Sequence, residues 1–80
     1  MKHILHSYRN RKSGFIDTTV YRQIEDGTWQ QGNDKPFSDW WPAPMFRPDD
    51  YKGCFGADLP DLTPQDAAAQ LRRLKEEQAK

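Results

Sequence analysis

Hydrophobic and polar residues alternate along the first third of the chain, and a period of two predicts β-strands. We expect one strand at residues 3–8 and a second at residues 15–24, which is rich in β-branched and aromatic side chains. A third strand is expected at residues 28–31. Because only short polar segments separate them, we predict a three-stranded antiparallel meander over residues 1–33.

The two predicted hairpin connections differ in their sequence signals. Residues 9–14 form a polar connection that ends in Gly14. Between the second and third strands stands Asp26-Gly27, a pair that favours a tight type I′ turn with positive φ at both central positions. We therefore expect the second hairpin to be closed by a two-residue loop.

Residues 34–62 break this pattern. Prolines are too closely spaced there for a helix or a central strand, and they stand at positions 36, 42, 44, 48 and 60. The same segment carries large apolar side chains, namely Phe37, Trp40, Trp41, Met45, Phe46, Tyr51 and Phe55. We expect an irregular, aromatic-rich wrap that covers the sheet.

Residues 63–80 have the signals of a helix. Thr63 is suited to the N-cap, Pro64 to the first turn, and Asp66 to the third position of a capping box. The apolar stripe of this helix is narrow, because Leu71 and Leu74 are its largest members.

Together these elements predict a single small α+β domain over residues 1–80, with a meander, an irregular wrap and a C-terminal helix. The length of 80 residues suits one domain, and 12% aromatic residues argue against full disorder. The expected core consists of Ile4, Leu5, Phe15, Ile16, Val20, Tyr21, Ile24, Trp29, Leu71 and Leu74.

Charge is balanced overall but unevenly distributed. Twelve basic and twelve acidic residues give a net charge of zero, so the whole molecule has no strong field toward nucleic acid or membrane. Residues 1–24 nevertheless carry five basic residues and one acidic one, a net of +4, whereas residues 25–66 carry a net of −6. No apolar run is long enough for a membrane span, and we expect a cytoplasmic location.

The residues capable of site chemistry are few. His3 and His6 fall on opposite faces of a strand, and with Cys54 as the sole thiol they do not make a metal-binding set. We expect Cys54 to be structural and the abundant carboxylates to cap turns and solvate loops. The chain has no phosphate-binding loop, dinucleotide fingerprint or nucleophile elbow, so we expect no cofactor and no enzymatic activity.

One basic cluster favours nucleic acid as a partner. Arg9, Arg11 and Lys12 lie close to Tyr8 and Phe15, and cations with neighbouring aromatic rings are typical of surfaces that bind single strands. The alternative interpretation is a solvated hairpin loop. Nucleic-acid binding through residues 9–12 is therefore our second functional hypothesis.

The first hypothesis is protein binding through the proline-stiffened segment at residues 39–48. Trp, Met and Arg are enriched at protein interfaces, and one of two adjacent Trp residues in an extended segment faces outward. The expected contact residues are Asp39, Trp40, Trp41, Met45, Phe46, Arg47, Asp49 and Asp50. We accordingly expect a non-enzymatic inhibitor or accessory protein, of the type encoded by phages and mobile elements, that blocks a larger protein or complex.

Overall fold

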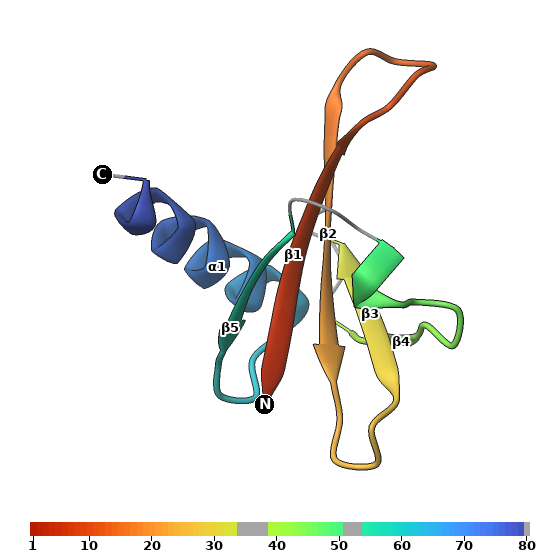
Figure 1. The fold of residues 1–80 in the computed structure, drawn as a ribbon, viewed down its shortest axis with the longest axis vertical. Coiled ribbons are helices and arrows are strands. Elements are labelled where there is room, and N and C mark those ends of the chain that lie inside the picture. Colours follow the sequence, from red (N-terminus) through yellow and green to blue (C-terminus); the bar gives the residue numbers. More distant parts are fainter. Residues whose placement is uncertain (34–38, 51–53, 80) are drawn as a thin grey trace.

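The computed structural model describes residues 1–33, 39–50 and 54–79, and it confirms an α+β fold (Figure 1). A five-stranded antiparallel sheet with the order β4-β3-β2-β1-β5 is accompanied by one C-terminal helix, α1. The strands and the short 3-10 helix are β1 Lys2–Arg9, β2 Ile16–Gln23, β3 Trp29–Asn33, β4 Trp41–Pro42, η1 Pro48–Asp50 and β5 Phe55–Asp58. The helix α1 spans Pro64–Gln78.

The predicted meander is present, but it is the centre of a wider sheet. β1, β2 and β3 pair in chain order, with Leu5 opposite Val20 and Tyr21 opposite Gln31. The prediction of three strands is wrong in number, because the segment at 34–62 supplies β4 and β5. Both added strands are short and lie at the edges of the sheet, where proline and glycine are tolerated. Of the predicted wrap residues, Pro36, Phe37 and Tyr51 lie outside the described residues.

The turn between β2 and β3 differs from the predicted type. Gly27 N–H donates to the carbonyl of Ile24 at 2.9 Å, and Ile24 N–H donates to the carbonyl of Thr28 at 2.9 Å. Gly27 has a φ of 88°, whereas no other described residue except Gly14 has a positive φ. The predictions of positive φ at Asp26 and of a two-residue loop are therefore wrong, because Ile24 and Thr28 close the hairpin around residues 25–27. Glu25 and Asp26 have negative φ, and Gly27 after them adopts the left-handed conformation. The Asp26 carboxylate accepts hydrogen bonds from both the N–H and the hydroxyl of Thr28.

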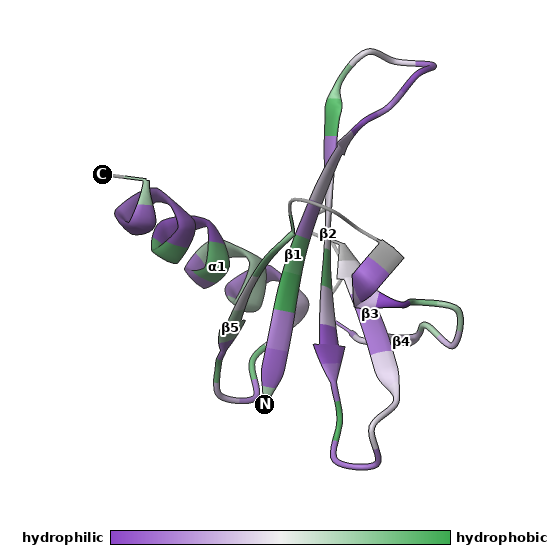
Figure 2. Ribbon diagram, viewed as in Figure 1, coloured by the Kyte–Doolittle hydropathy of each residue, from purple (hydrophilic) through white to green (hydrophobic). Residues whose placement is uncertain are grey.

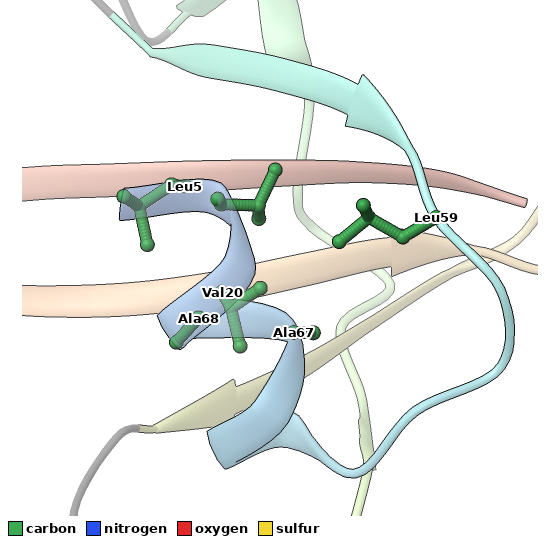
Figure 3. Packing of buried hydrophobic residues seen from close by; sticks show 6 residues of the cluster. Leu5, Val20, Leu59, Ala67 and Ala68 are labelled. Atoms are coloured by element: carbon green, nitrogen blue, oxygen red, sulfur yellow. The ribbon is translucent and has the colours of Figure 1, made fainter. Parts of the chain in front are cut away.

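The helix begins where the sequence predicts. The Thr63 hydroxyl accepts from the N–H of Asp66 at 3.3 Å, and Pro64 is the first helical residue. α1 crosses the sheet face formed by alternate residues of β1 and β2, and its C-terminal half extends past β5 (Figure 1). Figure 3 shows the resulting core cluster, which consists of Leu5, Val20, Leu59, Ala67, Ala68 and Leu71.

The opposite sheet face is covered by the segment that follows β4. Phe46 stacks on Tyr21 with ring centroids 3.7 Å apart. Trp29 contacts Phe46 in an edge-to-face arrangement, with ring centroids 4.9 Å apart. Ile4 and Ala43 complete this second buried cluster. The sheet is therefore buried on both faces at its centre, as the predicted wrap requires.

The outer part of the β1–β2 hairpin is covered on neither face by this packing. β5 pairs with β1 only as far as Leu5, and β3 pairs with β2 only as far as Thr19. We refer to residues 7–18 as the arm, which projects beyond the rest of the sheet (Figure 1). The prediction that Phe15 and Ile16 belong to the core is wrong, because they are 73% and 59% exposed.

Candidate functional site

β4 and the turn that follows it hold two large apolar side chains in solvent. Trp41 is 55% exposed and Met45 is 82% exposed. Between and beside them, Ala43 and Phe46 are buried, and the Ala43 N–H donates to the carbonyl of Trp29 at 3.0 Å. The backbone that carries these side chains is thus held to the sheet by the pairing of β4 and the Ala43 hydrogen bond, and after Met45 by the buried Phe46.

An open groove of about 680 Å³ lies beside Trp41. It brings together residues of β2, β3 and β4 with the residues that precede α1. Its lining consists of Arg22, Gln30, Asp39, Trp40, Trp41, Asp61, Leu62 and Thr63. A smaller groove of about 260 Å³ lies next to Met45 and Pro42, so that β4 is flanked by two depressions.

The wall of the larger groove is organised around Trp40. The indole N–H donates to the carbonyl of Leu62 at 2.9 Å, and the Arg22 guanidinium lies 4.5 Å above the ring. Arg22 also donates to the side-chain oxygen of Gln30 at 2.8 Å and pairs with Asp61. Several interactions therefore hold Trp40 and Arg22 in place, which makes this wall a rigid part of the groove.

Comparison of the chain with known protein families, with curated proteins and with solved structures gave no match. The arrangement of the described residues is therefore the basis for assigning a function.

The predicted partner-binding residues divide into exposed and buried ones. Asp39, Trp41, Met45, Arg47 and Asp49 are exposed, whereas Trp40 is half-buried and Phe46 is buried. Asp50 lies in η1, and its side chain lies outside the described part of the chain. The structure thus distinguishes Trp41 from Trp40, because Trp40 packs against the cluster under α1. Phe46 is buried against Tyr21 and anchors the segment to the sheet.

Sequence reasoning missed part of the groove. Arg22, Gln30 and Asp61 come from two strands and from the loop before α1, and no local pattern links them. One sequence signal could have pointed to the groove. Arg22 interrupts the apolar face of β2, and a cation is unusual on a strand face that becomes buried.

The predicted nucleic-acid residues are all exposed at the tip of the arm. Arg9, Arg11 and Lys12 surround a turn in which the Asn10 side-chain oxygen accepts from the N–H groups of Lys12 and Ser13. Arg9 donates to the carbonyl of Gly14 at 3.1 Å. The tip is therefore a structured turn that presents its cations outward.

The histidines and the cysteine do not converge. Among residues 1–33, 39–50 and 54–79 there is no cluster of three His, Cys, Asp or Glu side chains suited to a metal. Cys54 is a partly buried free thiol against the second core cluster, and burial raises its pKa, which disfavours the reactive thiolate. In the same described ranges, no helix has the length and apolarity that spanning a membrane requires.

His3 should make stability depend on pH. Its side chain is buried beside Trp40, where Nδ1–H donates to the Met1 carbonyl at 2.9 Å and Nε2 has no partner within the described part of the chain. Burial lowers the pKa of His3 from 6.5, and the nearby amino terminus and Arg22 lower this pKa further. The hydrogen bond to the Met1 carbonyl and the charge of Asp61 act in the opposite direction but do not outweigh burial. Just below pH 6.5, His3 is therefore protonated to a greater extent in the unfolded chain than in the folded protein. We expect stability to fall as the pH falls below about 6.5.

Chemical denaturation between about pH 7 and about pH 5 measures this loss, above the range in which the carboxylates titrate. Burial also lowers the pKa of His6, so a His6→Asn variant isolates the contribution of His3. Proton NMR titration of the His3 ring supplies the direct check. A His3 pKa at or above 6.5, or equal stability across this range, would contradict the expectation.

Proposed function

We propose that the protein is a non-enzymatic protein-binding module whose partner covers Trp41, Met45 and the groove beside Trp41. The observation that carries the proposal is the exposure of Trp41 and Met45 on a segment that the buried residues Ala43 and Phe46 hold against the sheet. Apolar side chains on a backbone that is already held in place require less ordering of the chain on binding. Such residues are the usual centres of binding energy at interfaces.

The charges around this surface indicate the chemistry of the partner. Asp39 lines the groove, where Asp61 is paired with Arg22, and Asp49 is exposed in η1 beyond Met45. We propose a partner that presents an apolar pocket with basic residues at its rim, because opposite charges at a rim steer association. A surface of this kind on a small domain can supply a standard protein interface of ~800 Å², which suits an inhibitor or accessory protein that blocks a larger machine.

Replacing Trp41 by alanine is expected to weaken binding by about 2 kcal/mol or more, which is roughly thirtyfold in Kd. Stability should change little, because the Trp41 side chain is exposed whereas Trp40 and Phe46 hold the segment. The partner is first isolated from a lysate of the source cells, and its Kd is then measured by titration calorimetry. Thermal unfolding of the free variant measures stability.

Phe15→Ala is the matched control, because it removes an aromatic ring that is 73% exposed from the arm, away from β4. This variant should bind the protein partner with unchanged Kd. Equal binding by the wild type and Trp41→Ala, or a loss seen only with Phe15→Ala, would place the interface elsewhere.

A further inference from the structure

The arm combines exposed aromatic side chains with exposed cations. Tyr8 and Phe15 are 44% and 73% exposed, and the cations between them, Arg9 at the end of β1 and Arg11 and Lys12 in the turn, are exposed as well. Figure 2 shows that the outer end of β2 is hydrophobic although it lies far from the helix. Large apolar side chains in that position contribute little to the core, so their presence calls for a role at the surface.

The strand register places the aromatic rings on one face of the arm. Tyr8 lies opposite Asp17, and the Asn10 N–H donates to the Phe15 carbonyl at 2.8 Å, which makes these two residues the closing pair. His6 stacks on Tyr8 with ring centroids 5.3 Å apart. The same face therefore carries His6, Tyr8 and Phe15 in a row that leads toward the basic turn.

The charge of the arm is positive and is not neutralised by ion pairs. No ion pair involves Arg9, Arg11 or Lys12 among the residues that the structure describes. The acidic residue of the arm, Asp17, accepts a hydrogen bond from the Asn10 side chain at 2.9 Å.

Acidic residues concentrate at the other end of the molecule. Glu25 and Asp26 lie in the β2–β3 turn, and Asp58, which pairs with the amino terminus, ends β5 beside the start of β1 (Figure 1). This separation of charge directs the arm toward a polyanion even though the net charge is zero.

We propose that the arm binds single-stranded nucleic acid, with Tyr8 and Phe15 stacking on bases and Arg11 and Lys12 contacting phosphates. Aromatic rings that are exposed on a positively charged ribbon match the two requirements of sequence-tolerant single-strand binding. Exposed rings alone would suit any apolar surface, whereas rings combined with uncompensated cations favour a partner that offers both flat bases and a line of negative charges. This surface is separate from β4, so it gives the protein a second binding activity that is independent of the proposed protein interface.

Fluorescence anisotropy with a labelled oligothymidylate tests the proposal, starting at about 50 mM salt. Phe15→Ala should weaken binding by about tenfold, because one stacked base is lost. Arg11→Gln combined with Lys12→Gln should weaken binding and reduce the salt slope by about 1.4, as expected for two phosphate contacts on a single strand. This pair leaves the Arg9–Gly14 hydrogen bond in place.

The control variant combines Arg73→Gln with Lys75→Gln, which removes the same charge from exposed positions of α1. It should retain wild-type binding and salt slope, and Trp41→Ala should retain them as well. A duplex oligonucleotide should bind more weakly than the single strand, because its bases are not free to stack. The proposal is overturned by absence of binding at low salt, by equal losses in arm and helix variants, or by no effect of Phe15→Ala.

Discussion

Replacing Leu71 by alanine is expected to lower the free energy of unfolding by about 2–5 kcal/mol. The Leu71 side chain is the largest fully buried side chain of α1, and it packs in the core cluster between the helix and the sheet. Alanine is the best helix former, so the loss reports packing and not helix propensity. In a domain of this size the unfolding midpoint should fall by at least about 8 °C, measured by circular dichroism.

Leu74→Ala is the appropriate comparison, because Leu74 lies one turn later on the same stripe and is only partly buried. The decrease in the free energy of unfolding should be clearly smaller for Leu74→Ala. The Leu74 side chain buries less apolar area on folding, and the space that it leaves is open to solvent. Equal losses for the two leucines would mean that the C-terminal part of α1 packs as tightly as its centre, contrary to the structure.

Gly32→Ala is expected to destabilise the protein by about 1–3 kcal/mol or more through overpacking. An added Cβ would lie 2.4 Å from the Cβ of Pro64 and 2.7 Å from its Cγ. Neither partner can yield easily, because Gly32 is buried in β3 opposite Val20 and Pro64 is the rigid first residue of α1. The first turn of the helix would have to move away from the sheet.

Gly56→Ala serves as the control, because a Cβ at this strand glycine would meet its nearest atom, the His3 carbonyl oxygen, at 3.4 Å. That substitution should cost far less than Gly32→Ala. A Pro64→Gly background removes the clashing ring, so the cost of Gly32→Ala should shrink there, and a denaturant double-mutant cycle measures the coupling. Additive effects would show that the contact between β3 and the start of α1 does not limit the packing.

Local signals in the sequence sufficed for the elements whose causes are local. The alternation in residues 3–8 and 15–24 predicts β1 and β2 and separates Leu5 and Val20 from Ile4 and Tyr21, as the two core clusters confirm. Thr63 and Pro64 define the start of α1 because capping depends on residues within one turn. The sequence likewise placed Arg9, Arg11 and Lys12 together in one exposed connection.

Contacts between distant segments required the tertiary structure. Phe55–Asp58 contains glycine and aspartate and has a weak strand signal, yet it becomes β5 because β1 offers a free edge to pair with. Trp40 and Trp41 are equivalent in sequence, and tertiary contacts with the Leu62 carbonyl, with Arg22 and with the cluster under α1 decide that Trp40 turns inward.

The exposure of Phe15 and Ile16 has the same kind of origin. Their strand pattern is that of core residues, but β3 and β5 pair with β2 and β1 too near the base of the hairpin to cover them. Periodicity along one strand states which side chains share a face and says nothing about how far a neighbouring strand extends. The sequence therefore determined the central strands, the helix and the charged loop. The tertiary structure decided which apolar side chains remain in solvent, because burial depends on the segments packed against them.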